Sequence, residues 1–273
     1  MFSSAQIHNL KKNPMPAATV TIEDDGSGDL AKPEGLAFDG SGNLWVGAEH
    51  LGLVLEYTAS QLNAGGVQTP HIILNGNSFS FDSSSLPIFD GSGNLWVIDE
   101  SVSNGNGGSG EIFKYTASEV AGFTAGTNHV DPAFGLGASI FQHIEGAAFD
   151  AQGNMWLADE DADKVYEFSA SQLSGSGLGN DLAPVVTLSP VTVKGHCTES
   201  IDGPYGVAID AKGNLYIVNT GTTGPSCVGS ITEFAAKKIA ASGSPAPKAF
   251  VSSNSTGSNV DFSGYPVFGP TVP

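Results

Sequence analysis

The chain has 273 residues, of which 10 are basic and 28 are acidic, so its formal net charge at pH 7 is −18. A surface this negative repels phosphate groups, which argues against nucleic acids and anionic membranes as partners. The hydrophobic content of 40% is enough for a sizeable core, and no apolar run reaches the roughly 18 residues that a membrane-spanning helix needs.

One sequence pattern occurs four times along the chain. Its copies begin at Pro33, Ser84, Ile144 and Pro204. In each copy an anchor aspartate is followed by a Gly-Asn pair and a large aromatic residue: Asp39 and Trp45, Asp90 and Trp96, Asp150 and Trp156, Asp210 and Tyr216. A repeat of this length is typical of propeller blades and other repeat architectures.

Each copy predicts four strands, which we name A to D. In the first copy, strands A (35–39) and B (43–48) flank a tight turn, where Asp39 bonds to the backbone ahead of it and glycine supplies a positive φ. Strand C (54–57) leads into a short helix with the capping-box spacing Thr58 to Gln61, and strand D (71–74) follows. Small residues in strand A suit the crowded centre of a propeller, and the strand B aromatics suit the space between blades.

The chain is therefore predicted to be one all-β domain over 1–273, a β-propeller of four-stranded antiparallel blades. The complete blades cover these ranges: 33–83, 84–143, 144–203 and 204–262. Residues 2–32 and 263–273 match parts of a blade. If these two parts share a blade, the ring has five blades and lacks a B strand. An unpaired edge inside a blade is unfavourable, so we expect a fragment of a larger ring, with six blades.

The pattern Gly-x-Ala-x-Asp-x-x-Gly-Asn-Leu-Trp resembles the NHL-repeat propellers. It is also similar to the gluconolactonase-type six-bladed propellers and to virginiamycin B lyase. The first enzyme family implies a divalent metal on the axis, held by a Glu-Gly at the start of a strand A; Glu34-Gly35 and Glu145-Gly146 match this element. The lyase family implies Glu-x-His-Gly, whereas this chain has the reverse order from His143 to Glu145.

The connections between strands B and C differ in length among the copies, which points to the end where strands A begin and strands B end as the functional face. If Asp39 pairs with Leu44, Glu34 lies opposite Glu49, and Glu145 lies opposite Glu160. Like charges directly opposite each other are destabilising unless something neutralises them. With Asp159 and other aspartates nearby, these pairs predict a cation site whose oxygen ligands suit Ca²⁺ or Mg²⁺.

Two other interpretations of these carboxylates stay open. In a chain of this charge, acidic residues at loop ends are often simply solvated. A shared proton, with one carboxyl of each pair raised in pKa, is the other account. His143 stands beside the acidic hairpin ends and is the candidate general acid or base, and a solvent-exposed bystander is the alternative.

The two cysteines, Cys197 and Cys227, fall almost opposite each other when the fourth hairpin is extended, so a disulfide is predicted, with two free thiols as the alternative. A disulfide implies an oxidising compartment, extracellular or periplasmic, although residues 1–16 show no signal peptide. We therefore expect an extracytoplasmic scaffold that presents an acidic, cation-binding face to a small molecule or protein. The alternative is a metal-dependent lactonase or a streptogramin-lyase-like enzyme.

Overall fold

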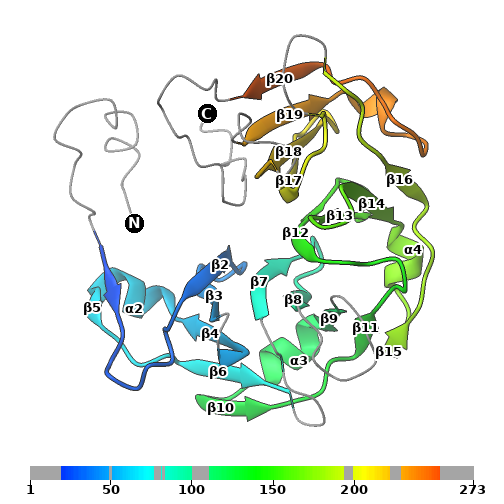
Figure 1. Cartoon of the computed structure of the whole chain (residues 1–273). Coiled ribbons are helices and arrows are strands. Elements are labelled where there is room, and N and C mark those ends of the chain that lie inside the picture. Colours follow the sequence, from blue (N-terminus) through cyan, green and yellow to red (C-terminus); the bar gives the residue numbers. More distant parts are fainter. Residues whose placement is uncertain are drawn as a thin grey trace, which may run out of the picture.

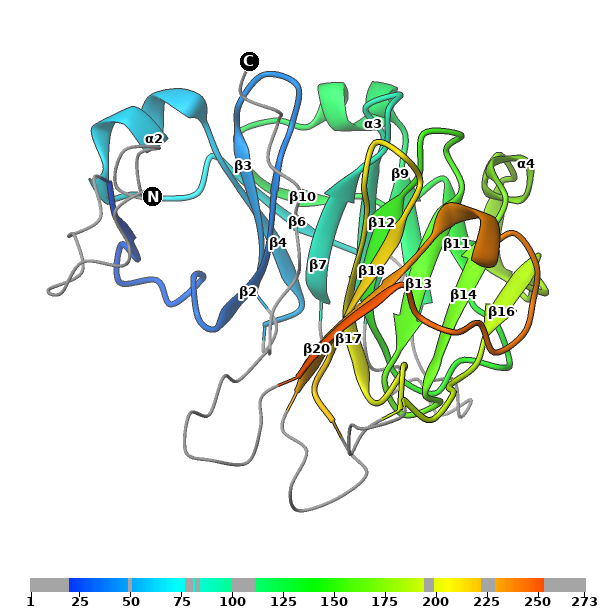
Figure 2. The ribbon, with the colours of Figure 1, turned by 90° about the horizontal axis from the view of Figure 1, so that it is seen from above.

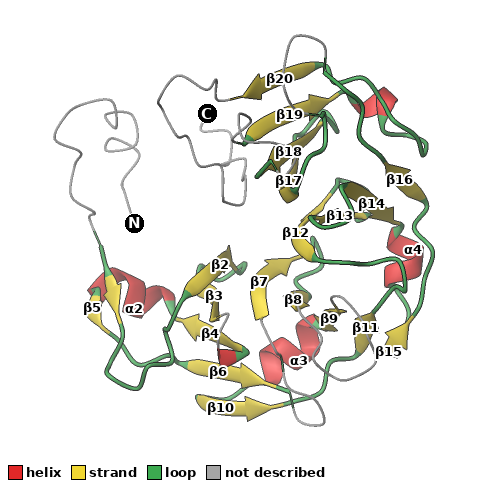
Figure 3. Ribbon diagram, viewed as in Figure 1, coloured by secondary structure: helices red, strands yellow, loops and turns green. Residues whose placement is uncertain are grey.

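The computed structural model describes residues 20–48, 51–76, 81, 84–99, 111–193, 199–221 and 229–252. Within these ranges four antiparallel sheets stand around a common centre as the blades of a β-propeller, with a few short helices (Figures 1 and 3). The predicted blade architecture is thus confirmed for four blades. A six-bladed ring stays a prediction, and the partial-blade segments 2–19 and 263–273 lie outside the described residues.

Each blade has its strands in the predicted order from the centre outwards (Figure 1). Blade 1 consists of β2 (Pro33–Phe38), β3 (Leu44–Ala48), β4 (Leu53–Tyr57) and β6 (Ile72–Asn75). Blade 2 consists of β7 (Ser84–Phe89), β8 (Leu95–Asp99), β9 (Glu111–Tyr115) and β11 (Phe134–Leu136). Blade 3 consists of β12 (Ile144–Phe149), β13 (Met155–Asp159), β14 (Lys164–Phe168) and β16 (Val186–Leu188). Blade 4 consists of β17 (Pro204–Ile209), β18 (Leu215–Asn219), β19 (Ser230–Phe234) and β20 (Ala249–Ser252).

The anchor aspartate builds the turn between strands A and B. Asp39 Oδ1 accepts hydrogen bonds from the backbone N–H groups of Ser41 (2.8 Å) and Asn43 (3.0 Å). Its Oδ2 accepts from Asn43 Nδ2 (2.9 Å) and from the indole N–H of Trp45 (3.2 Å). The Asn43 side chain then accepts from the N–H of Ala59, at the start of the next helix. The Asp, Asn and Trp of the repeat are therefore explained by the turn itself.

The helices begin where the capping boxes predict. They are α2 (Ala59–Ala64), α3 (Ala117–Gly122) and α4 (Ala170–Leu173), capped by Thr58, Thr116 and Ser169. Blade 4 has a 3-10 helix, η2 (Ala236–Lys238), whose N-terminal residue makes no side-chain cap. The helices lie at the same end of the blades as the A–B turns, which we call the turn face (Figure 2). The opposite end, where strands A begin and strands B end, is called the mouth.

Neighbouring blades are tied together at their outer edges by short parallel strands that the sequence analysis did not predict. These strands are β5 (Gly66–Val67), β10 (Gly126–His129) and β15 (Gly177–Asn180). The partner of β5 is β1 (Ile22–Glu23), which lies in the N-terminal segment that was predicted to match part of a blade. The segment after the helix of blades 2 and 3 pairs with strand D of the preceding blade, β10 with β6 and β15 with β11, and in blade 1 the corresponding β5 pairs with β1. In blade 4 the described residues show only an isolated bridge between Leu188 and Gly243. The outer edges of blades 1 and 2 are thereby covered, which removes an open row of backbone groups there. Among the described residues, β16 and β20 are the outermost strands of blades 3 and 4.

The hydrophobic core lies in layers between the blades. Trp45 of blade 1 packs edge-on against Phe89 of blade 2, with ring centroids 5.8 Å apart, and Trp96 packs on Phe149 of blade 3 at 5.6 Å. Trp156 joins the cluster that contains Val207 of blade 4. The predicted place of the strand B aromatics between blades is confirmed. None of the helices in the described part of the chain has the length and apolar content needed to cross a bilayer.

Candidate functional site

The mouth is shaped by a register shift that recurs in all four hairpins. Strands A and B pair regularly near the turn and shift at the first residues of strand A, as between Ile144 and Gly146 in blade 3. Three of the residues at the shift are Glu34 and Glu145, the two glutamates of the predicted site, and Tyr205 in blade 4. A bulge leaves one residue outside the regular pairing and re-aims its side chain, here at the centre of the propeller.

The predicted pairing of opposed glutamates is therefore wrong. In blade 3, Phe149 pairs with Met155 and Ile144 pairs with Asp159, so Glu145 has no direct partner across the ladder and does not face Glu160. In blade 1, Phe38 pairs with Leu44 and Pro33 with Ala48, which likewise moves Glu34 away from the predicted register. Residue Glu49 itself lies outside the described residues, as do Cys197 and Cys227.

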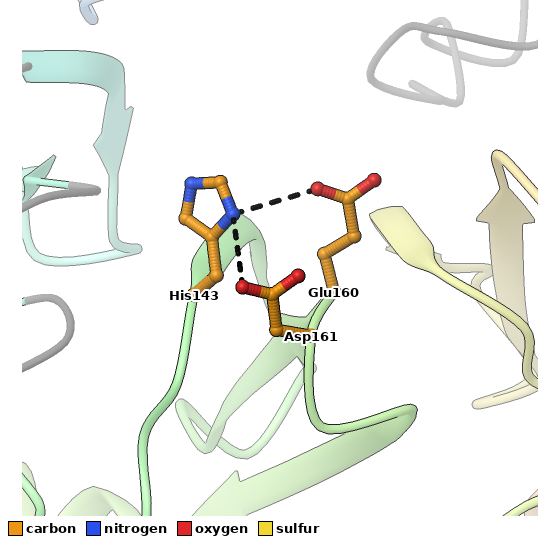
Figure 4. A group of neighbouring side chains, drawn as sticks. All are labelled: His143, Glu160 and Asp161. Carbon is orange, nitrogen blue, oxygen red and sulfur yellow. Dashed lines mark ion pairs between the residues drawn. The ribbon is translucent and has the colours of Figure 1, made fainter. Parts of the chain in front are cut away.

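Blade 3 nevertheless brings the predicted residues together around His143. Its Nε2 lies 3.3 Å from Glu145 Oε1, and its Nδ1 lies 3.5 Å from Glu160 Oε2 and 4.0 Å from Asp161 Oδ2. Figure 4 shows the imidazole with Glu160 and Asp161, which come from the loop after β13. The Glu145 side chain is 5% exposed and the His143 ring 33% exposed, so a buried carboxylate holds one side of a ring that solvent reaches.

Asp159, which was predicted as a ligand of the cation, holds the backbone of the segment before β12. Its carboxylate is fully buried and accepts hydrogen bonds from the backbone N–H groups of Gln142 (3.0 Å), His143 (2.9 Å) and Ala162 (3.3 Å). Desolvation raises the pKa of Asp159, and these backbone hydrogen bonds oppose the rise. Asp159 thus fixes the segment that carries His143, and a role as metal ligand stays a prediction for it.

The loop after β13 is also joined to blade 4. The Thr220 hydroxyl lies 3.0 Å from Glu160 Oε1 and 3.1 Å from the Gly203 carbonyl, and it can donate to either. Asp163 has a left-handed backbone (φ 51°), and its Oδ1 accepts from the N–H of Gly203 at 2.7 Å. Two blades therefore determine where the Glu160 carboxylate lies, which limits its freedom to move away from His143.

Glu34 lies at the mouth in a separate contact. Its Oε1 accepts a hydrogen bond from the hydroxyl of Tyr205, which belongs to β17 in blade 4. The two residues are 171 positions apart in the chain, so this contact is a direct sign that strands A of distant blades meet at the centre. The predicted gathering of distant side chains at one mouth is confirmed, although Glu34 is not part of the group around His143.

The donor set at His143 differs from the all-oxygen set that was expected. Among the described residues, His143, Glu160 and Asp161 each offer one ligand atom, and these atoms lie within 4.8 Å of one another. Two atoms bound to one ion at about 2.0–2.2 Å lie at most about 4.4 Å apart, so small side-chain movements would bring the three atoms around a single ion. An imidazole nitrogen with two carboxylates suits Mn²⁺ or Zn²⁺ better than Ca²⁺, which prefers oxygen. The residues present therefore fit a divalent ion.

Part of this site was visible in the sequence. Glu145, Glu160 and His143 were singled out for their charge and position, and Asp161 stood among the nearby aspartates. The contact between Tyr205 and Glu34 gave no signal, because nothing local relates residues of blades 1 and 4. Close packing between blades explains the glycine of the Glu-Gly element. A Cβ at Gly146 would lie 2.5 Å from the Tyr205 carbonyl oxygen.

No protein-family model matches the sequence, and no curated protein matches it. Solved structures similar to this one include hydrazine synthase from Kuenenia stuttgartiensis, with a TM-score of 0.53, 10% identity, and coverage of 83% of this chain and 50% of that chain. The nidogen/laminin complex gives a TM-score of 0.50, 15% identity, and coverage of 81% and 64%. A gluconolactonase from Xanthomonas campestris gives 0.47, 13% identity, and coverage of 76% and 59%.

The neighbours with TM-scores of 0.53 and 0.50 share a likeness of fold with this chain. At such identities the likeness concerns the fold alone. This chain spans between half and about two thirds of the length of the similar chains, at 50%, 64% and 59% for these three.

Proposed function

We propose that this protein is an extracytoplasmic β-propeller that binds a divalent cation at its mouth and, through that cation, a small molecule or a protein. The observation that supports this most strongly is the group formed by His143, Glu160 and Asp161, whose ligand atoms lie within 4.8 Å of one another. The carboxylates neutralise the charge of the ion. The Thr220 hydroxyl lies beside Glu160, and Asp159 accepts a hydrogen bond from the backbone N–H of His143. The Ca²⁺ or Mg²⁺ expected from the sequence stay candidates, joined by Mn²⁺ and Zn²⁺.

Calorimetric titration of the chelator-treated protein with each of these four cations tests the proposal. We expect Glu160→Gln and Asp161→Asn each to weaken binding by about 10-fold, the scale on which changes at a metal site act. Glu167→Gln is the matched control, because Glu167 lies in the same blade near the turn face. Affinity should also fall with decreasing pH, since protons compete for the same three groups. Absence of binding at about 1 mM of every cation, where a weak site would still fill, contradicts the proposal.

A second candidate function is a metal-dependent lactonase or a lyase that uses His143 as general acid or base. It is favoured by the buried Glu145 carboxylate, 3.3 Å from His143 Nε2, because a carboxylate beside an imidazole orients the ring and stabilises its protonated form. The two functions make different demands on His143, since Nδ1 cannot bind a cation and exchange protons at once.

His143→Gln separates these functions. If His143 is a ligand, the variant loses cation affinity by about 10-fold or more, and no lactone hydrolysis is seen in the wild type. If His143 is the acid or base, the wild type hydrolyses lactones in a pH-stat assay. The variant then loses activity by about 100-fold or more while it keeps its cation affinity.

A further inference from the structure

Three equivalent grooves open between the blades at the turn face, far from the mouth. Strand β12 has six residues and therefore separates the two ends of blade 3 by about 17 Å. The grooves have volumes of about 280 Å³ between blades 1 and 2, 660 Å³ between blades 2 and 3, and 420 Å³ between blades 3 and 4. Each is bordered by an A–B turn, the strand B aromatic and a residue of strand C.

The groove between blades 2 and 3 is the largest of the three, and the charge of its strand C residue distinguishes it from the other two. Opposite the strand B aromatic stand Glu56 in blade 1 and Glu167 in blade 3, whereas Lys114 occupies this position in blade 2. These three residues line the three grooves in that order. One groove of a repeated set thus carries a cation where the other two carry a carboxylate.

Lys114 is held in a fixed position at this groove. Its side chain is largely buried, with 8% of the residue exposed, and its ammonium donates to the Leu173 carbonyl oxygen at 2.7 Å. The same ammonium lies 5.2 Å from the ring centre of Trp96 and 5.4 Å from that of Phe134. An ammonium has three N–H donors, and the Leu173 carbonyl takes one of them. The Lys114 ammonium is therefore fixed in place while it still has N–H donors for a ligand.

Asp90, whose charge acts on Lys114, is engaged by hydrogen bonds of its own turn. Asp90 accepts hydrogen bonds from the backbone of Ser92 and Asn94, from the Asn94 amide and from the Trp96 indole. Burial alone would raise the pKa of Asp90, but these hydrogen bonds outweigh it and lower the pKa. Burial also lowers the pKa of Lys114, against the opposing charges of Asp90 and Glu119, so its ammonium gains from a further anionic partner.

We propose that the groove between blades 2 and 3 binds a small organic acid, with its carboxylate at the Lys114 ammonium and an apolar or aromatic body against Phe149 and Leu173. Both apolar residues line the groove, and Ser174 and Gln152 add polar groups at its border. A desolvated ammonium attracts a carboxylate more strongly than a solvated one, and the apolar lining favours a ligand that is not fully polar. This site is independent of the function proposed for the mouth.

The probes are 2-naphthoate and its neutral analogue 2-naphthamide, titrated into the whole protein. We expect naphthoate to bind at least 10-fold more tightly than naphthamide. Lys114→Met should remove this preference and leave naphthamide binding within 2-fold, because the methionine side chain keeps the apolar packing. Lys114→Glu, which copies the other two grooves, should abolish naphthoate binding. Equal binding of the two probes to the wild type, or an unchanged preference in Lys114→Met, overturns the proposal.

Two further measurements keep the test decisive if the Lys114 variants do not fold. Two-dimensional NMR of the wild type with naphthoate should shift the backbone amide signals of Gly91, Gln152 and Ser174. Shifts confined to the mouth or scattered over the surface contradict the site. Glu167→Lys should create a second naphthoate site in the groove between blades 3 and 4, and an unchanged stoichiometry in a folded variant counts against Lys114 as the determinant.

Discussion

The two ends of the β12–β13 hairpin use carboxylates in opposite ways. At the turn face, Asp150 accepts hydrogen bonds from the N–H groups of Gln152, Asn154 and Trp156, and both of its oxygens are engaged within one short turn. At the mouth, Glu145 and Glu160 lie 3.3 and 3.5 Å from the two nitrogens of one imidazole, His143. The same hairpin thus has one end built by local bonds and another built by groups from separate elements.

The repeat pattern follows this division. All four copies have the turn aspartate and the Gly-Asn pair that follows it. The position of His143 holds Lys32, Ser83 and Gly203 in the other copies, so the histidine is specific to blade 3. The position of Glu160 also holds glutamate in the first two copies, Glu49 and Glu100, and Thr220 in the fourth. A carboxylate whose oxygens all accept hydrogen bonds within its own turn stabilises the fold. Several carboxylates that lie beside one imidazole indicate a functional site. Four substitutions test this difference between the two ends, and they follow in decreasing order of expected effect.

Gly146→Ala is expected to have the largest effect on stability. The added Cβ would lie 2.5 Å from the Tyr205 carbonyl oxygen and 2.9 Å from Gly206 Cα, and both atoms belong to backbone that cannot give way easily. We expect a loss of about 3 kcal/mol in the free energy of unfolding, measured by urea denaturation. Gly122→Ala is the control, because a Cβ at this exposed helical position meets nothing within 4 Å. Equal stability of the two variants would mean that blades 3 and 4 are not in close contact there.

Asp150→Ala tests the turn end of the hairpin. It leaves the N–H groups of Gln152, Asn154 and Trp156 without their acceptor, so we expect about 2 kcal/mol of destabilisation in the same assay. Cation affinity of the folded variant should not change. Gln152→Ala alters the side chain but keeps the backbone donor, and it should stay within about 0.5 kcal/mol of the wild type. A clear loss of cation affinity in Asp150→Ala would show that the two ends are coupled.

Asp159→Asn tests the support of His143 through the pH dependence of stability. Burial raises the pKa of Asp159 above its usual 3.8, so the folded state binds its proton more tightly than the unfolded state. This contribution to stability is fully present below pH 3.8 and is lost as the pH rises through the folded-state pKa. The stability of the wild type relative to the variant, measured by urea denaturation across this range, should fall with rising pH. A relative stability that rises with pH contradicts the raised pKa.

Glu160→Gln is expected to have the smallest effect on stability. The side chain is 21% exposed, and its contacts with His143 and Thr220 are those of a partly solvated group. We expect a change within about 0.5 kcal/mol, even though the same variant should weaken cation binding about 10-fold. A large loss of stability would place Glu160 with Asp150 among the residues that serve the fold.

Most of the fold could be predicted from the sequence, because its determinants are local. The bonds of Asp39 reach no further than Trp45, six positions away, and the capping box joins Thr58 to Gln61. The place of Trp45 between blades also follows from the repeat, since each blade meets the next in the same way. The candidate site was predicted in part: its acidic residues and histidine could be named, but the pairing that was to bring them together was wrong.

The repeated blades, their turns and their helix caps could therefore be derived from the amino-acid sequence alone. The folded structure was needed to reveal the register shift at the mouth, the outer parallel strands, and the contact of Tyr205 with Glu34. It also showed that Asp159 holds the backbone of His143, and that Lys114 faces a groove. These features depend on how twisted strands crowd around a centre and on contacts between blades, and no short sequence pattern encodes either of them.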